Sequence, residues 1–331
     1  MLKLSELKEK LHKNKFLIIG RAGIDLFPDP PGTKTEEAKY FESQLGGSSA
    51  NIAVSLTKLG GKCHLLTCVS EDALGRLAIK KLKNFGVNTS FIRYVKGDIR
   101  ISFSVVETTI KNHQSIIFRN GAADLMMNKK DINQVDFTKF SCLIFTGTCL
   151  TCEPTRTATF HALKIAKKNH LPIVFDIDYR PYTWKSLKET SKIFLKAARF
   201  SDILIGNDDE FGILAGNYKK GLNIAKKLSN SSTIVVYKMG DRGSVTFSEN
   251  NTIKTGVFNI KPIKPTGAGD AFMGGFISSL MHKKNIQNSL ITGSASAAIV
   301  VTKVGCSLAM PNIKELQLFI NKHKLKNFTK L

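Results

Sequence analysis

The sequence of 331 residues lacks any uninterrupted apolar run long enough to span a lipid bilayer. Its charged first stretch, MLKLSELKEKLHKNK, also lacks the apolar centre of a secretory signal peptide, and we expect a short solvated helix or a frayed end there. We find no other targeting signal. These absences argue against a membrane partner and predict a cytoplasmic protein.

Acidic residues are scarce relative to basic ones. The chain has 26 aspartates and glutamates against 49 lysines and arginines, which gives a formal net charge of +23. Such a surplus first suggests a nucleic-acid partner. However, the lysines are spread singly or in pairs over the whole chain, and no DNA- or RNA-binding motif accompanies them. We therefore expect no nucleic-acid partner, because an anionic small substrate or compositional bias explains the charge equally well.

Cysteine is sparse and forms no strong metal-binding pattern. The six cysteines include one CxxC, Cys149 and Cys152, without a second pair to complete a zinc site. The seven histidines show no ligand spacing such as HxxxH. We expect reduced thiols near a buried strand rather than a metal site.

What the sequence does contain is a regular alternation of apolar strands and amphipathic helices. Buried strands are expected at 16–20, 63–69, 142–147, 172–178, 202–207 and 233–240. Their alternation with helices predicts an α/β fold, a doubly wound and mostly parallel sheet with helices on both faces. Ligands of such sheets bind beyond the carboxyl ends of the strands, where Asp25, Asp178, Asn207 and Lys238 occur.

Two segments break this alternation. Residues 25–45 are rich in proline and polar residues, and residues 98–119 alternate with period two around a polar turn, which is typical of a β-hairpin. A small sheet that covers the site as a lid and an extension of the main sheet's edge both fit this pattern. We predict the lid, inserted into one core made of residues 15–24, 46–97 and 120–331.

The stretch KPTGAGDAFMGGF, residues 264–276, places an acid directly behind a glycine-rich turn. Gly267, Ala268 and Gly269 can point successive N–H groups into one concavity, and the helix that starts there adds positive potential. Asp270 is then a candidate general base beside an anion cradle, which suits phosphoryl transfer to a hydroxyl group. An acid that only caps the helix is the alternative.

The usual phosphoryl-transfer signatures are missing. The sequence contains no GxxxxGK[ST] motif, so it is not a P-loop enzyme, and the HRD and DFG motifs of protein kinases are also absent.

A second glycine-rich turn precedes a helix near the N-terminus. Gly46 and Gly47 form this turn, and Ser48 or Ser49 is expected to cap the helix. Asn51 lies in the first helical turn and offers both a donor and an acceptor to a polyol hydroxyl. A solvent-facing asparagine near a cap is the alternative.

Two weaker motifs follow predicted strands. Asn207 and Glu210 lie one turn apart at a predicted helix start, where they fit a hydrated magnesium ion or simply a capping box. Gly240 and Gly243 lie in a loop that fits either a nucleotide's phosphates or an ordinary turn.

The order of these motifs resembles the ribokinase family, the pfkB-type carbohydrate kinases, over about residues 15–311. The resemblance implies a doubly wound core with a β lid, ATP and Mg²⁺ as cofactors, and phosphorylation of a sugar-like hydroxyl. It also implies that Asp270 is the catalytic base and that the amides of Gly267, Ala268 and Gly269 form the anion hole. Members often need a monovalent cation near that hole, so K⁺ is a further expected cofactor.

The same resemblance implies binding roles for the other motifs. Asp25, Gly46, Gly47 and Asn51 would bind the sugar. Asn207 and Glu210 would organise the phosphates and the magnesium ion, the metal through water. The ATP groove would be lined by Lys238, Gly240 and Gly243, and by Ser296 on the adenine-side helix at 293–301, where many members carry asparagine.

Within the family, the stretches GRAGIDL, FRNGAADL and FDIDYRPYTW most resemble the 5-dehydro-2-deoxygluconokinases of myo-inositol breakdown. Two of these stretches contain Arg119 and Arg180, and a guanidinium group matches a carboxylate bidentately, so we expect one of them to bind a sugar acid. A surface position for Arg119 and a structural salt bridge for Arg180 are the alternatives. The chain departs from the family's D-x-N-x-R motif at Asp178, and it carries Lys238 where ribokinases tend to have threonine.

The predicted function is therefore ATP-dependent phosphorylation of a primary hydroxyl of a sugar acid, 5-dehydro-2-deoxy-D-gluconate. The alternatives within this class are a 2-dehydro-3-deoxygluconate kinase, a ribokinase and a fructokinase. Outside the class, the alternative is a non-catalytic sugar- or nucleotide-binding regulator. The expected partners are the small-molecule substrate and ATP, and exposed lid strands would also allow a homodimer.

Overall fold

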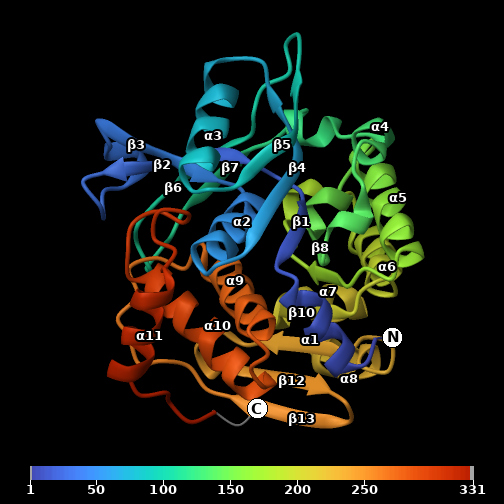
Figure 1. The fold of residues 1–331 in the computed structure, drawn as a ribbon. Coiled ribbons are helices and arrows are strands. Elements are labelled where there is room, and N and C mark those ends of the chain that lie inside the picture. The colour runs from blue at the N-terminus through green and yellow to red at the C-terminus, as the bar shows by residue number, and fades with distance from the viewer. Residues whose placement is uncertain (1, 329–331) are drawn as a thin grey trace.

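The alternating apolar segments form one nine-stranded sheet in the computed structural model, which describes residues 2–328 (Figure 1). Its strands are β1 Lys15–Ile19, β4 Lys62–Ser70, β5 Asn88–Val95, β8 Cys142–Thr146, β9 Ile173–Asp176, β10 Ile203–Asn207, β11 Ile234–Lys238, β12 Ser244–Ser248 and β13 Asn251–Thr255. They lie in the order β13-β12-β11-β10-β9-β8-β1-β4-β5. All neighbours are parallel except the pairs β11–β12 and β12–β13, so the sheet is mostly parallel, as predicted.

Helices cover both faces of this sheet. They are α1 Leu4–His12, α2 Ser48–Lys58, α3 Ala73–Asn84, α4 Lys129–Asn133, α5 Thr155–Lys168, α6 Leu187–Ala198, α7 Asp208–Ala215, α8 Gly221–Leu228, α9 Ala268–Met281, α10 Ile286–Val301 and α11 Ile313–Lys322. Side chains of β1 alternate between the two faces: Phe16 and Ile18 join the core under α2 and α9, whereas Leu17 and Ile19 join the core with α5 and α6. This confirms the doubly wound fold.

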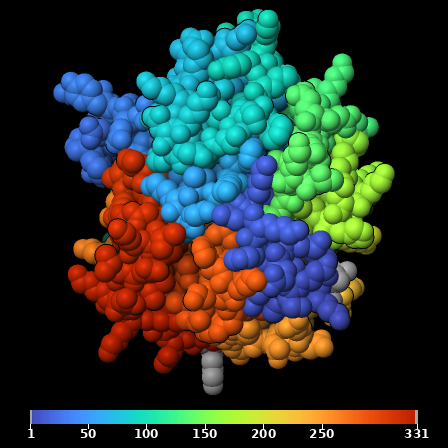
Figure 2. Space-filling model, in the orientation of Figure 1, coloured from blue at the N-terminus to red at the C-terminus, as the bar shows by residue number. Residues whose placement is uncertain are grey.

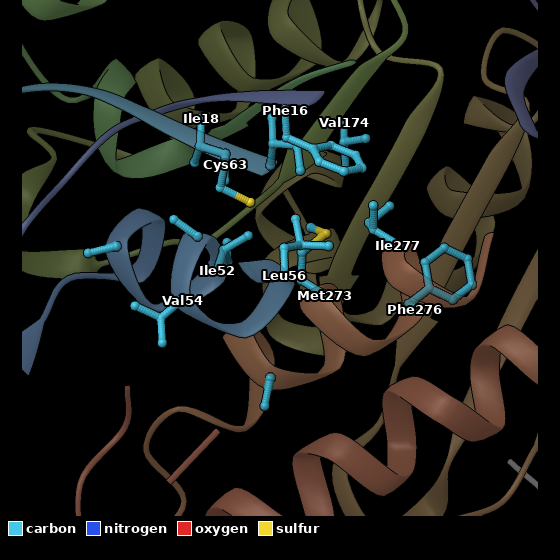
Figure 3. Close-up of a cluster of buried hydrophobic side chains, with 14 of the residues drawn as sticks. Phe16, Ile18, Ile52, Val54, Leu56, Cys63, Val174, Met273, Phe276 and Ile277 are labelled. Atoms are coloured by element: carbon cyan, nitrogen blue, oxygen red, sulfur yellow. The ribbon is translucent and has the colours of Figure 1, made fainter. Parts of the chain in front are cut away.

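The two helices that begin with glycine-rich turns, α2 and α9, pack against each other over the sheet (Figure 3). Leu56 of α2 and Met273 of α9 lie in this apolar layer beneath Phe16 of β1. Gly274 permits the close approach, since a Cβ atom there would lie 2.1 Å from the Oγ atom of Ser55 on α2. Gly274 therefore serves the packing of α9 against α2.

The two segments that break the alternation form a separate small sheet. Its strands are β2 Gly23–Asp29, β3 Tyr40–Gly46, β6 Phe103–Val106 and β7 Ser115–Phe118, in the order β3-β2-β6-β7. The predicted hairpin is the antiparallel pair β6–β7, and β6 pairs in parallel with β2. The blue segment of β2 and β3 projects from the main body (Figure 2). The alternative of an extended main-sheet edge is therefore wrong.

The N-terminal stretch differs in part from expectation. It does form a helix, α1, but Leu7 and Leu11 are fully buried in the main core, so the helix is docked rather than solvated. Within residues 2–328, we find no helix with the length and apolar character that a membrane crossing requires.

Candidate active site

Five neighbouring parallel strands, β11, β10, β9, β8 and β1, end at the same edge of the sheet, and a cavity of about 860 Å³ opens there. Its walls also include residues of the small sheet, the first turn of α9 and one side of α10. Among the predicted site residues, those that line it are Asp25, Gly47, Asn51, Arg119, Asp178, Arg180, Asn207, Glu210, Lys238, Gly240, Gly243, Gly267, Ala268, Gly269 and Asp270. Gly46 and Ser296 do not.

The turn before α9 has the backbone that an anion cradle requires. Gly267 has a φ of +84° and is the N-cap of α9, so no side chain caps this helix and Asp270 is not a capping acid. A Cβ atom at Gly267 would lie 2.9 Å from the Sγ atom of Cys306. The first N–H groups of a helix have no helical acceptor, so those of Ala268 and Gly269 are available at the cavity wall.

Asp270 lies in the first turn of α9 and is held by α2. The Nδ2 atom of Asn51 donates a hydrogen bond to Oδ2 of Asp270 at 2.8 Å, and Oδ1 of Asn51 accepts one from Oγ of Ser307 at 2.6 Å. Burial raises the pKa of Asp270 to about 7, and the charge of Asp178 adds to this rise, while the hydrogen bond from Asn51 opposes it. A carboxyl group with this pKa suits a general base.

Further carboxyl groups gather at the ends of β9 and β10. Burial raises the pKa of Asp176 well above its usual value and also raises the pKa of Glu210, and the positive charge of Lys238 opposes both shifts. The Nζ atom of Lys238 also lies 5.6 Å from the ring centre of Phe272 and 3.5 Å from where a Cβ atom of Gly269 would be. Lys238 therefore lies beside the glycine turn and lines the cavity. Asp176 lies in the FDIDYRPYTW stretch, but we predicted no role for it.

Asn207 and Glu210 form the capping box that the sequence allowed. Oδ1 of Asn207 accepts from the Glu210 amide at 2.8 Å, and Oε2 of Glu210 accepts from the Asn207 amide at 2.7 Å. Oε1 of Glu210 accepts from the amide of Tyr179 at 3.2 Å. No group of three histidine, cysteine, aspartate or glutamate side chains within residues 2–328 is placed to hold a metal ion directly.

Asp25 lines the cavity from β2 of the small sheet. Its carboxylate is buried and accepts a hydrogen bond from Oγ of Ser104 at 2.6 Å. Gly46 is needed beneath it, because a Cβ atom there would lie 2.0 Å from Oδ1 of Asp25. Sequence reasoning missed Arg21, which is buried in the cavity wall and donates from Nε to Oγ of Ser102 at 2.7 Å. Its place directly after strand β1 is the signal that would have found it.

The two predicted arginines both line the cavity, but their side chains have different partners. Arg119 is buried, so the alternative of a surface arginine is wrong; it donates from Nε to Asp124 at 2.9 Å and from Nη2 to the carbonyl of Thr148 at 3.0 Å. Its buried Nη1 atom has no partner within residues 2–328. Arg180 forms an ion pair with Asp178 at 2.7 Å. Asp178 has a φ of +37°, an unusual value for a residue with a side chain.

Two local predictions were wrong. The N-cap of α2 is Gly47, with a φ of +97°, and neither Ser48 nor Ser49 caps the helix; Ser49 donates instead to the carbonyl of Ile19 at 3.1 Å. Ser296 is fully buried where α10 packs on Gly275 of α9, and its Oγ atom faces no partner within residues 2–328. The helix does line the cavity, through Ser294, Ala297, Ala298 and Val301.

Comparison with known proteins decides the family. Residues 13–313 match the family described as pfkB family carbohydrate kinase. The chain belongs to that family. It is 35% identical over 313 residues to a 5-dehydro-2-deoxygluconokinase of Clostridium tetani, with 92% of each chain covered. These two matches confirm the prediction that the protein is a carbohydrate kinase.

Solved structures confirm the ribokinase-like fold of this pfkB kinase. A fructokinase from Xylella fastidiosa, solved with bound ATP, has a TM-score of 0.82 at 20% identity and covers 94% of this chain and 99% of its own. A fructokinase double mutant from Vibrio cholerae O395, in a form bound to fructose, ADP and a potassium ion, has a TM-score of 0.81 at 24% identity and covers 93% and 98%.

Proposed function

We propose that this kinase transfers the γ-phosphoryl group of ATP to a primary hydroxyl of a sugar acid, 5-dehydro-2-deoxy-D-gluconate. One observation carries the proposal: the carboxylate of Asp270 lies in the cavity at the start of α9, directly after the Gly267–Gly269 turn and held by Asn51. The name of the Clostridium tetani relative supports the choice of substrate.

Asp270 is the general base of the proposed reaction. Its carboxylate removes the proton from the acceptor hydroxyl while the oxygen attacks the phosphorus atom. The N–H groups of Gly267, Ala268 and Gly269 stabilise the negative charge that builds on the phosphoryl oxygens, because fixed donors at a helix N-terminus need no rearrangement. Lys238, whose ammonium lies beside Gly269, adds positive charge at the same place.

The residues present fit a nucleotide with a hydrated metal ion. ATP supplies the phosphoryl group, and the neighbouring structures solved with bound ATP or ADP support the choice of this nucleotide. Gly240, Gly243 and Ser294 line the part of the cavity where we place the nucleotide. No three side chains within residues 2–328 form a direct metal site, so Mg²⁺ would be held by phosphates and water. Asn207 and Glu210 would bind that water.

The acceptor end of the cavity fits a polyol with a carboxylate. Asp25 and Asn51 offer a carboxylate and an amide to hydroxyl groups. The buried Nη1 atom of Arg119, which has no partner among the described residues, offers a positive donor to a carboxylate, which favours an acid over a neutral sugar. Arg180, already paired with Asp178, would contribute the second guanidinium group.

We also propose that the small sheet forms a homodimer contact in the cytoplasm. Its edge strands β3 and β7 expose apolar side chains, with exposed fractions of 72% for Tyr40 and 50% for Phe118. Sedimentation of the wild-type chain and of a Tyr40→Lys/Phe118→Lys variant would test this, since the dimer should dissociate in the variant.

A substrate panel tests the function. Formation of ADP is measured with ATP and Mg²⁺ against 5-dehydro-2-deoxygluconate, 2-dehydro-3-deoxygluconate, ribose and fructose. We expect the first acid to give the highest kcat/KM, and Asp270→Asn to lower kcat by about 100- to 10,000-fold while ATP still binds. A higher kcat/KM with another member would replace the substrate, and binding without ADP formation would support a non-catalytic regulator.

A further inference from the structure

Lys264 is a buried cation that the proposed reaction does not use. Its side chain is fully buried, yet no carboxylate within residues 2–328 forms an ion pair with it. The Nζ atom instead donates to two backbone carbonyls, that of Thr266 at 2.7 Å and that of Val300 at 3.2 Å. An uncompensated ammonium inside a protein is costly, so its surroundings must stabilise the charge.

The two acceptors connect the glycine turn to the end of α10. Thr266 directly precedes Gly267, the N-cap of α9, and Val300 lies in the last turn of α10. Two backbone hydrogen bonds connect the same segments: the amides of Ile263 and Lys264 donate to the carbonyl of Val301, at 2.8 and 3.4 Å. The last carbonyls of a helix carry partial negative charge, which favours a cation there.

The ammonium thus lies between a helix C-terminus and a phosphate cradle. Burial lowers the pKa of Lys264, while the negative charges of Asp270 and Asp25 oppose that shift, so both carboxylates lie close enough to feel the charge. Lys264 also lines the cavity. Two oxygen ligands of the kind that a monovalent metal ion would need behind the cradle are already occupied by its Nζ atom.

We propose that Lys264 is a built-in monovalent cation: its ammonium fixes the carbonyl of Thr266, holds the Gly267–Gly269 turn in place and supplies permanent positive charge behind the anion hole. The residues present therefore do not fit the K⁺ ion expected from the family resemblance, and the kinase works without it. Lys264 is a positioning residue, and this role rests on the phosphoryl-transfer function proposed above.

The wild-type enzyme provides the first test. ADP formation with the best acceptor is measured in potassium, sodium and tetramethylammonium chloride at equal ionic strength. We expect kcat to agree within about twofold, since the fixed charge replaces the ion. A loss of tenfold or more without K⁺ would overturn the proposal.

The variant Lys264→Met provides the second test, with Lys261→Met as a matched control on the exposed part of the same loop. We expect Lys264→Met to lower kcat by about tenfold or more while the KM for ATP changes little, and Lys261→Met to behave as wild type. In Lys264→Ala, which leaves space beside the two carbonyls, ammonium or potassium ions should restore part of the lost activity. Wild-type kcat in Lys264→Met would contradict the inference.

Thermal unfolding gives a readout that does not depend on catalysis. The wild-type melting temperature should not differ between KCl and NaCl, whereas Lys264→Ala should be stabilised by KCl relative to NaCl. A K⁺-specific stabilisation of the wild type would count against the lysine's role even if no sugar in the panel is phosphorylated. Failure of the panel alone would refute the proposed function and leave this result standing.

Discussion

The amide of Asn51 on α2 donates to the carboxylate of Asp270 on α9, at a distance of 2.8 Å between Nδ2 and Oδ2. The donor orientation of this amide is fixed, because its oxygen accepts from the hydroxyl of Ser307 at 2.6 Å. A hydrogen bond to a carboxylate favours its ionised form, so Asn51 keeps the proposed base available against the effect of burial.

The pH dependence of the reaction should follow Asp270. The base works only as the carboxylate, and its pKa is raised to about 7, so kcat/KM should fall by roughly tenfold per pH unit as the pH drops below this value. Asn51→Ala removes a contact that lowers the pKa, so the acidic limb should move to higher pH, with kcat/KM at pH 7 lower by about tenfold. Ser307→Ala, which frees the amide to turn, should move the limb less in the same direction. An unshifted limb in Asn51→Ala would show that another group titrates.

Arg119 should distinguish acid from neutral substrates. Arg119→Gln removes the buried Nη1 donor, and we expect the KM for a sugar acid to rise by about 10- to 100-fold with little change for ATP. Arg93→Gln is a suitable control, since Arg93 is also paired with an aspartate, Asp131, but does not line the cavity. Equal effects of the two variants in steady-state kinetics would assign Arg119 a structural role only.

Two of the three serines of α10, Ser294 and Ser296, should behave differently. Ser296→Ala removes a buried hydroxyl without a partner in the described chain, so we expect an unchanged KM for ATP and a free energy of unfolding within about 1 kcal/mol of wild type. Ser294→Leu places a larger side chain in the cavity wall and should raise the KM for ATP by about tenfold. Kinetics with ATP as the varied substrate check both. A large effect of Ser296→Ala would restore the role predicted from the sequence.

The contact between α2 and α9 should be sensitive to a single methyl group. In Gly274→Ala the new Cβ atom would lie 2.1 Å from Oγ of Ser55, so we expect a loss of about 1–3 kcal/mol in the free energy of unfolding, measured by urea denaturation. The double variant Gly274→Ala/Ser55→Gly should recover most of this loss, because the clash is then removed. Additive effects of the two substitutions would contradict this explanation.

Strong local patterns predicted the framework of the fold. Apolar strands alternating with helices gave the parallel sheet, and period-two alternation gave the β6–β7 hairpin. The placement of Asp178, Asn207 and Lys238 at strand ends was sufficient to bring them to one cavity, because β9, β10 and β11 are neighbours.

Features that depend on distant contacts were not predictable. Serine is a common helix N-cap, yet the hydroxyl of Ser49 donates to the carbonyl of Ile19 on β1 instead. The face of α10 that meets the cavity depends on its packing against α9, so Ser296 was assigned to the wrong side. The burial and role of Lys264 could not be predicted among so many basic residues, because its acceptor on Val300 is 36 residues away in the sequence.

Asp25 and Ser104 belong to the small sheet, whereas Asp270 and the glycine turn belong to the core. In the proposed reaction, the small sheet therefore supplies part of the acceptor's binding residues, whereas the glycine turn and the base that act on the phosphate belong to the core. If Asp25 binds the sugar as proposed, substitutions in strands β2 and β6 should change the choice of sugar while the start of α9 stays intact. Under this proposal, substitutions in the small sheet are one route by which new sugar specificities can evolve or be engineered.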